Sequence, residues 1–229
     1  PKGRASSVDN PANAKIASPR KPKKRFLLAG ASNLLCMGGM HVSPDFGIAS
    51  RWAAELVQAA LFEGATAVDA TLGNGHDALR LCSLVGESGR VYGFDVQADA
   101  VERTRRRLDE AGVLPRARLF CAGHERMAEF VPPGVDAVVF NLGWLPGSAH
   151  AVTTRAQTTL AAARQALELL APGALMTICV YPGHEEGARE RSALLAWAAA
   201  LPDGFDVINK RYLNCPKCPP ELIAVRKKR

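Results

Sequence analysis

From residue 64 to the C-terminus, short runs of β-branched and aromatic residues alternate with longer segments whose apolar residues recur every three or four positions. The first pattern is typical of buried strands and the second of amphipathic helices. We expect strands at 65–70, 90–95, 117–121, 135–140, 174–181, 205–212 and 221–225. We expect helices at 76–85, 98–111, 125–131, 154–170 and 185–201. This alternation predicts an α/β fold with a doubly wound, mostly parallel seven-stranded sheet.

Another amphipathic stretch precedes this region. Ile48, Trp52, Leu56 and Ala59 lie at helical spacing, which predicts a helix over 46–62 that packs on the domain. We therefore divide the chain into a tail at 1–25, an extension with this helix at 26–63, and one α/β domain at 64–229.

The net charge of +7 comes from the tail. Residues 1–25 hold eight of the 29 Lys and Arg residues but one of the 22 acidic residues, so the rest of the chain is formally neutral. The tail is rich in Pro, Ala, Asn and Ser, a composition too polar to bury a core, which predicts a disordered arm. Binding of phosphates by this arm is the alternative, because Lys and Arg release counterions from a polyanion.

The apolar content is distributed as in a protein without a membrane segment. No stretch approaches the roughly 18 unbroken apolar residues of a membrane span. Six cysteines are too few for a disulfide scaffold, and Cys82, Cys121 and Cys179 lie in apolar, periodic segments. These features predict a cytoplasmic protein. A plastid is the alternative, because the acid-poor tail has the composition of a transit segment.

The first expected strand leads into a glycine-containing loop, Asp69-Ala-Thr-Leu-Gly-Asn-Gly-His-Asp77. Gly73 and Gly75 allow a tight turn and close approach of a ligand to the backbone. The following helix begins with unpaired N–H groups. Asp95 ends the second strand, where a carboxylate can accept both hydroxyl groups of a ribose. Together these residues predict a nucleotide-binding pocket.

The same loop satisfies the permissive form of the dinucleotide motif G-x-G-x-x-G/A, which by itself is a weak signal. Two features favour S-adenosylmethionine instead. The D-x-x-x-G-x-G spacing gives a wider pocket and places Asp69 where the cationic methionine part would lie. Asp77 would repel a pyrophosphate. A turn that merely connects strand and helix is the remaining alternative.

The fourth expected strand runs into Asn141-Leu-Gly-Trp-Leu-Pro-Gly147. At the carboxyl end of this strand, the carbonyl group of Asn141 can accept a hydrogen bond from an amine and orient its lone pair toward a methyl donor. Trp144 can stack on a flat ring. The alternative is an Asx-type turn with a packed Trp. We expect Thr153 and Thr154 to cap the next helix.

These motifs resemble the YtqB-like family of rRNA methylases. The family is associated with MnmM, the methyltransferase that completes 5-methylaminomethyl-2-thiouridine at the tRNA wobble position. Further likenesses are Gly143 to Thr154, which matches an L-P-G…T-T run, Tyr181-Pro-Gly-His184, and the N-x4-P-P run from Asn214 to Pro220. The resemblance covers residues from about 64 onward and implies a Rossmann-like class I methyltransferase. Trp144 stands where Tyr is usual, Pro182 stands where His is usual, and two cysteines interrupt the last motif.

The resemblance also implies roles for single residues. The expected cofactor-binding residues are Asp69, Gly73, Asn74, Gly75, His76, Asp77, Asp95, Gln97, Gly123 and His124. The expected catalytic residues, facing the acceptor amine or its nucleotide, are Asn141, Tyr181 and His184. The expected substrate-binding residues are Trp144, Pro146, Gly147, Thr153 and Asn214. The implied partner is tRNA, bound through its anticodon stem-loop, and a homodimer is left open.

Cys215-Pro-Lys-Cys218 has the spacing of half a zinc site, and with His184-Glu-Glu186 it imitates the motif order of zinc nucleobase deaminases. Those cysteines should open a helix, whereas Pro219-Pro220 indicates a turn that enters a strand. We therefore expect no catalytic metal and leave a structural zinc open. Three hypotheses remain: a methyltransferase for the tRNA wobble uridine, a methyltransferase for rRNA or a small amine, and a non-catalytic Rossmann module that binds RNA or a nucleotide.

Overall fold

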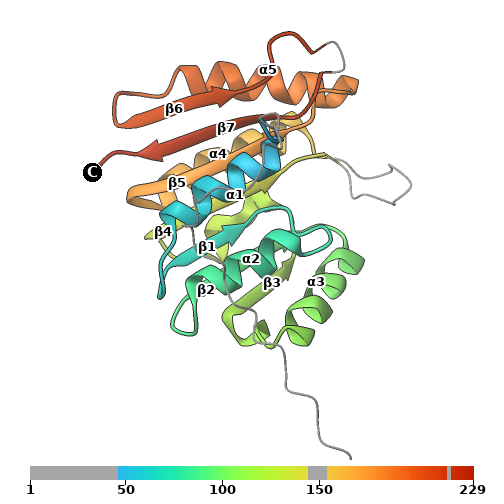
Figure 1. Cartoon of the computed structure of the whole chain (residues 1–229), viewed down its shortest axis with the longest axis vertical. Coiled ribbons are helices and arrows are strands. Elements are labelled where there is room, and N and C mark those ends of the chain that lie inside the picture. The colour runs from blue at the N-terminus through green and yellow to red at the C-terminus, as the bar shows by residue number, and fades with distance from the viewer. Residues whose placement is uncertain (1–45, 144–153, 216–217) are drawn as a thin grey trace, which may run out of the picture. The chain divides into compact units, whose positions relative to one another are not determined.

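The computed structural model describes residues 46–143, 154–215 and 218–229. Over these ranges the chain forms one sheet with helices on both faces (Figure 1). The expectations for the basic tail and for most of the extension before residue 46 lie outside the described residues. None of the described helices is both long enough and apolar enough to span a bilayer.

Seven strands form the sheet in the order β3-β2-β1-β4-β5-β7-β6. Strands β1 to β5 pair in parallel, and β7 lies antiparallel between β5 and β6. The bounds are β1 Thr66–Asp69, β2 Arg90–Asp95, β3 Ala117–Cys121, β4 Val135–Asn141, β5 Leu170–Val180, β6 Phe205–Lys210 and β7 Glu221–Lys227. The strand order reverses direction between β1 and β4, where doubly wound sheets open a crevice for ligands. The predicted fold class is confirmed.

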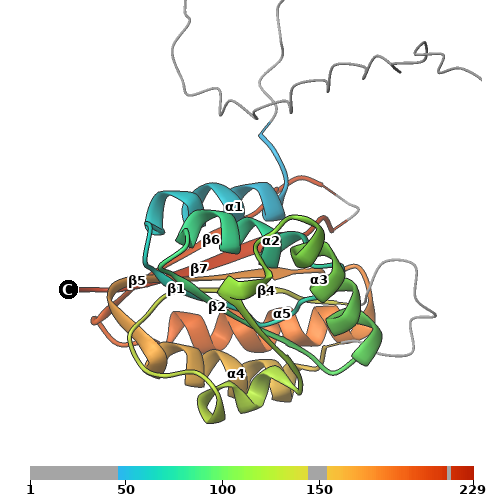
Figure 2. The ribbon, with the colours of Figure 1, turned by 90° about the horizontal axis from the view of Figure 1, so that it is seen from below.

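The helices form two outer layers (Figure 2). One face of the sheet is covered by α1, α2 and α3, and the other by α4 and α5. Their bounds are α1 Ala49–Ala60, α2 His76–Val85, α3 Ala98–Glu110, α4 Ala156–Leu169 and α5 Glu185–Ala199, with 3-10 turns η1 Leu114–Arg116 and η2 His124–Glu129.

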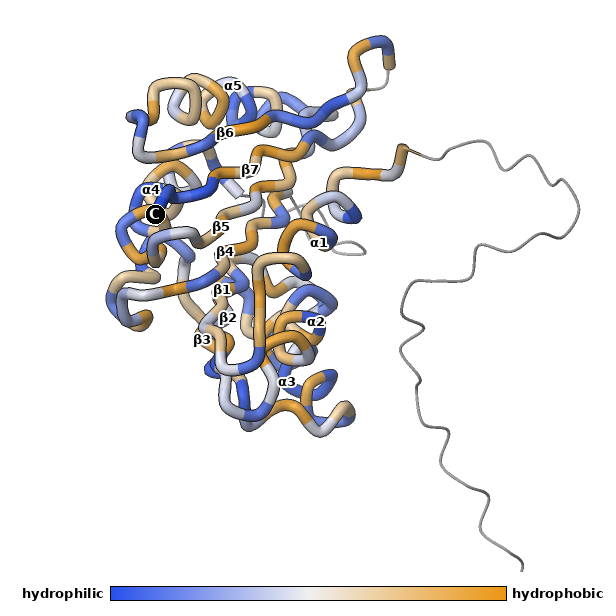
Figure 3. The backbone as a smooth tube through the Cα atoms, turned by 60° about the vertical axis from the view of Figure 1, so that its left-hand side comes forward, coloured by the Kyte–Doolittle hydropathy of each residue, from blue (hydrophilic) through white to orange (hydrophobic). Residues whose placement is uncertain are grey.

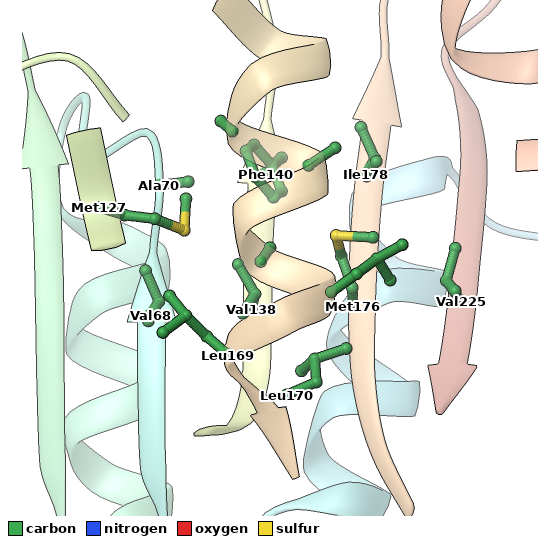
Figure 4. Close-up of a cluster of buried hydrophobic side chains, with 14 of the residues drawn as sticks. Val68, Ala70, Met127, Val138, Phe140, Leu169, Leu170, Met176, Ile178 and Val225 are labelled. Atoms are coloured by element: carbon green, nitrogen blue, oxygen red, sulfur yellow. The ribbon is translucent and has the colours of Figure 1, made fainter. Parts of the chain in front are cut away.

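The strands divide the core because successive side chains of a strand point to opposite faces. Val68, Val138 and Met176 belong to the cluster under α4 and α5, part of which is drawn in Figure 4. Their neighbours Ala67 and Ala137 belong to the cluster under α1, α2 and α3. Hydrophobic residues run along β4 and β5, whereas the helices alternate between hydrophobic and hydrophilic stretches (Figure 3). Both faces of the sheet are therefore buried.

Three local predictions differ from the structure. Strand β5 begins at Leu170 rather than at residue 174, because Leu170 already pairs with Val135 before the register shifts. The α-helix expected at 125–131 is the 3-10 turn η2. Helix α4 begins at Ala156 with Arg155 at its N-cap and no side-chain cap, so the predicted capping role of Thr154 is wrong.

The predicted N-terminal helix is present as α1. Its Trp52 ring lies 5.7 Å from the ring of Tyr212, between centroids, and the Lys210 ammonium group lies 4.4 Å from the Trp52 ring. The Tyr212 hydroxyl group donates a hydrogen bond to the Gly47 carbonyl group at 2.7 Å. These contacts join the start of α1 to the segment that follows β6.

Candidate functional site

A cavity of about 850 Å³ opens at the carboxyl ends of the parallel strands. Its wall is built from the segments that follow β1, β2, β3, β4 and β5, together with the start of α4 and the segment before β7. This volume lies within the usual range for small-molecule sites, about 300 to 1,000 Å³. The position at the strand reversal is the one where the sequence predicts a nucleotide pocket.

Asp95 forms a fixed acceptor on the cavity wall. One carboxylate oxygen accepts a hydrogen bond from the Gly73 N–H group at 3.0 Å, and the other accepts one from the Gln97 N–H group at 2.9 Å. Gly73 has φ +51°, a backbone conformation that favours glycine. An ionised carboxylate has about four acceptor positions, so two backbone bonds leave capacity for a ligand. Asp95 can therefore hold a ribose diol without moving.

The glycine loop is held from outside by α3. Arg107 on α3 donates a hydrogen bond from Nε to the carbonyl oxygen of Asn74 at 2.8 Å. Asn74, His76 and Asp77 all line the cavity. This contact holds the loop in place against the start of α2.

Gly75 has a structural role that differs from the prediction. It has φ +76° and does not line the cavity. A Cβ atom at Gly75 would lie 2.9 Å from the Cα atom of Thr104 on α3. The residue therefore permits close packing of the loop against α3, and its direct contact with a cofactor stays a prediction.

Asp69 lies behind the cavity rather than on its wall. Its side chain is 1% exposed, and one carboxylate oxygen accepts a hydrogen bond from the Thr71 N–H group at 3.0 Å. Burial, and next the charge of Asp77, raise the pKa of Asp69 to about 8. Asp69 therefore lies one layer deeper than the sequence predicts, and its contact with a cationic methionine group stays a prediction.

His124 and Gly123 line the end of the cavity that contains Gly73 and Asp95, named here the cofactor end because the sequence predicts a cofactor there. The His124 Nδ1 atom lies 3.2 Å from the carbonyl oxygen of Ala70, which can only accept, so the ring donates from this nitrogen. The ring meets Phe140 edge-on, with centroids 5.8 Å apart. Burial lowers the pKa of His124, which favours a neutral ring. His124 therefore acts as a neutral wall that fixes the end of β1.

At the other end of the cavity, three side chains from distant segments form a hydrogen-bonded series. The Tyr181 hydroxyl group donates to Asn141 Oδ1 at 2.8 Å, and Asn141 Nδ2 donates to Asp77 Oδ2 at 3.3 Å. The Asn141 N–H group donates to Thr71 Oγ1 at 2.7 Å. Burial raises the pKa of Tyr181 to about 12, so its hydroxyl group remains a donor. The amide of Asn141 is therefore held in one orientation.

His184 lies at this end as the N-cap of α5. Its Nδ1 atom accepts a hydrogen bond from the Gly187 N–H group at 3.1 Å. The wall also includes Thr154, Arg155 and Thr158 around the start of α4. It further includes Cys218, Pro219 and Pro220 from the segment before β7. The starts of α4 and α5 thus meet at this end of the cavity, named the acceptor end because the sequence predicts that Asn141, Tyr181 and His184 face the acceptor there.

Some predicted residues are not brought to the site. Asn214 is exposed and is absent from the cavity wall. Trp144, Pro146, Gly147 and Thr153 lie outside the described residues. Within the ranges that the structure describes, no three His, Cys, Asp or Glu side chains are placed to hold a metal ion, so no further zinc ligands accompany Cys215 and Cys218 there.

Sequence reasoning missed several residues that build the wall or support it. Thr71 accepts the Asn141 N–H group, and Arg107 donates to the Asn74 carbonyl group. Thr154 donates a hydrogen bond to Glu190 on α5. A signal for Glu190 was available: Gly187, Glu190 and Leu194 share the buried side of α5 at helical spacing. An acid within an apolar stripe indicates a buried polar contact, because a buried carboxylate requires hydrogen-bond partners.

Comparison with known proteins gives one family. A family model described as "Putative rRNA methylase" matches residues 91–226. The Arabidopsis thaliana protein "tRNA (mnm(5)s(2)U34)-methyltransferase, chloroplastic" is 39% identical over 168 residues, which is 69% of this chain and 61% of that protein. The chain thus spans 61% of the length of this curated relative.

Two solved structures are also similar. The "putative rRNA-methylase" from Clostridium thermocellum has 36% identity and a TM-score of 0.79, covering 80% of this chain and 100% of that one. A "putative methyltransferase" from Streptococcus mutans, in complex with SAH, has 31% identity and a TM-score of 0.73. It covers 80% of this chain and 99% of that one.

Proposed function

Because the chain belongs to the rRNA methylase family whose model it matches, we propose that it is an S-adenosylmethionine-dependent N-methyltransferase. The proposed acceptor is the exocyclic amine of 5-aminomethyl-2-thiouridine at the tRNA wobble position. The observation that supports this most directly is the single cavity wall that joins the Gly73–Asp95 contact to the Tyr181–Asn141–Asp77 series.

The cofactor end fits S-adenosylmethionine. Asp95 offers free acceptor positions beside Gly73, where a ribose diol can bind. Asn74, His76 and Gln97 add polar groups around it, and Asp77 places a carboxylate between the two ends of the cavity. A cationic methionine group is attracted by that charge, whereas a pyrophosphate is repelled. Bound S-adenosylmethionine would supply an electrophilic methyl group. The Streptococcus mutans neighbour in complex with SAH supports this fit.

The acceptor end suits an amine. Asn141 Oδ1 accepts one hydrogen bond from Tyr181 and keeps a second lone pair that can accept an N–H of the substrate. Tyr181 and Asp77 hold the Asn141 amide at its oxygen and its nitrogen. The amide can therefore orient the lone pair of the substrate amine toward the methyl group without reorganisation of the site. Methyl transfer to a neutral amine requires no strong base, and the main tasks of the chain are alignment and exclusion of water.

We propose tRNA as the partner, bound through its anticodon stem-loop. The printed name of the Arabidopsis thaliana relative refers to U34 of tRNA and to the chloroplast. This name supports the wobble position as the target. It also supports a plastid, rather than the cytoplasm, as the location. The basic residues in 1–25 would add phosphate contacts in such a complex.

The test is methylation of tRNA that carries 5-aminomethyl-2-thiouridine, with S-adenosylmethionine, followed by mass spectrometry of the nucleosides. We expect a single added methyl group on the wobble nucleoside. Methylation of rRNA or of a small amine in its place would contradict the proposed substrate. Calorimetry without binding of S-adenosylmethionine would contradict the enzyme assignment and favour a non-catalytic module.

A further inference from the structure

Glu190 is a buried acid outside the cavity wall. It lies on α5 with 2% exposure. One carboxylate oxygen accepts a hydrogen bond from the Thr159 hydroxyl group at 2.6 Å, and the other accepts one from the Thr154 hydroxyl group at 3.0 Å. Burial raises the pKa of Glu190, and both hydroxyl groups oppose that shift. A buried carboxylate is costly unless its hydrogen bonds are made, so this position invites a functional explanation.

Thr154 connects Glu190 to the end of β4. The Thr154 hydroxyl group has one hydrogen, which it gives to Glu190, and its lone pair accepts the Gly143 N–H group at 3.0 Å. The Thr154 N–H group in turn donates to the Gly143 carbonyl group at 3.2 Å. Because the Gly143 N–H group can only donate, the Thr154 hydroxyl group accepts from it and gives its own hydrogen to Glu190. Gly143 and Thr154 are thereby held as a closed pair.

This pair belongs to the acceptor end of the cavity. Gly143 and Thr154 both line the wall, and Gly143 follows Asn141 by two residues. Gly143 has φ +104°, and its ideal Cβ position is 3.9 Å from the Tyr181 ring. A second contact from α5 ties down α4, because Glu186 Oε1 accepts the Ala156 N–H group at 3.2 Å. Helix α5 thus holds the beginning of α4 against the end of β4.

We propose that Glu190 is a positioning residue for the acceptor side of the methyl-transfer site. Glu190 holds Thr154, and Thr154 holds Gly143. Gly143 follows Asn141 in the chain, so these contacts fix the backbone that positions Asn141. The inference rests on the proposed function, which it deepens. None of the contacts reaches Gly73, Asp95 or Gln97, so Glu190 governs the placement of the acceptor and not the affinity for S-adenosylmethionine.

The test compares Glu190→Gln, Thr154→Val and Thr159→Val in the full chain. Thr154→Val and Thr159→Val each remove one hydrogen bond to Glu190. Only Thr154 also forms a hydrogen bond with Gly143. We expect kcat on the tRNA substrate to fall about 10- to 100-fold in Glu190→Gln and Thr154→Val. We expect Thr159→Val to stay within about threefold of the parent. Thr154→Ser, which keeps the hydroxyl group, should restore turnover.

Calorimetric binding of S-adenosylmethionine is the second measurement, because a merely structural defect would weaken it as well. We expect its Kd to change by less than about twofold in all four variants. Parental turnover in Glu190→Gln would overturn the inference, as would equal losses of turnover in Thr154→Val and Thr159→Val. If Glu190→Gln does not fold, the comparison of Thr154→Val with Thr159→Val tests the inference by itself. An inactive parental chain would instead overturn the proposed function.

Discussion

The two ends of the cavity are held by different kinds of interaction. At the cofactor end, backbone N–H groups of Gly73 and Gln97 hold the carboxylate of Asp95. At the acceptor end, the Tyr181 side chain orients Asn141, and the Glu190 side chain orients Thr154. The first arrangement is built within two neighbouring loops of the sheet, whereas the second joins segments 36 to 40 residues apart in the chain.

This difference suggests a division of labour. A rigid backbone cradle suits a ligand that is the same in every turnover, and its failure should appear as lost affinity. A series of side chains suits alignment of a second reactant, and its failure should appear as lost turnover with affinity preserved. The following predictions test that division, beginning with the largest expected effect.

Asp95→Ala should weaken binding of S-adenosylmethionine by at least about 100-fold, because the ribose loses its charged acceptor and the Gly73 N–H group loses its partner. Calorimetry measures this directly. The control is Asp99→Ala, an exposed acid in the first turn of α3 that does not line the cavity. Similar affinity in both variants would remove Asp95 from the site.

Asn141→Ala should lower kcat by about 100-fold, because one preorganised hydrogen-bond partner of the reacting amine is lost. Affinity for S-adenosylmethionine should stay within about twofold of the parent. The two quantities come from single-turnover kinetics and calorimetry. A parallel loss of both would mean that Asn141 serves the structure and that the division between the ends is incorrect.

Gly75→Ala should lower the free energy of unfolding by roughly 2 to 4 kcal/mol, because φ is +76° and the new Cβ would meet the Thr104 backbone. The matched control is Gly134→Ala, where φ is +97° but no atom lies within 4 Å. Its loss should be about 1 to 2 kcal/mol. Chemical denaturation measures both, and equal losses would show that α3 does not press on the loop.

Tyr181→Phe should lower kcat by about tenfold, the smallest of these effects, because one neutral hydrogen bond to Asn141 is lost while the ring remains. Binding of S-adenosylmethionine should be unchanged. Tyr212→Phe removes a comparable hydroxyl bond, to the Gly47 carbonyl group, and Tyr212 does not line the cavity. If both variants lost turnover equally, the series through Asn141 would have no special role.

The cofactor end was largely readable from the sequence. Helix α2 and strands β2 and β3 begin and end where the periodicity places them. Gly73 and Asp95 meet as the strand–loop–helix pattern requires. These features succeed because they depend on residues close in the chain and on the fixed arrangement of neighbouring parallel strands.

The features that were predicted incorrectly depend on contacts between segments distant in the chain, which hydrophobic periodicity does not identify. Thr154 looked like a helix cap because Thr is favoured there, but its hydroxyl group is occupied by Glu190 and Gly143. Leu170 was expected to end the helix at 154–170, yet it pairs with Val135 at the start of β5. Asp69 looked like a ligand contact, and its burial behind the loop emerges only when the sheet is assembled.

The most direct test of the account is a calorimetric titration of the full chain with S-adenosylmethionine and, separately, with NADH. The account predicts one site for S-adenosylmethionine, lost in Asp95→Ala, and no binding of NADH. Binding of NADH in preference to S-adenosylmethionine would contradict it, because the loop after β1 would then accept a pyrophosphate in spite of the carboxylate of Asp77 beside it.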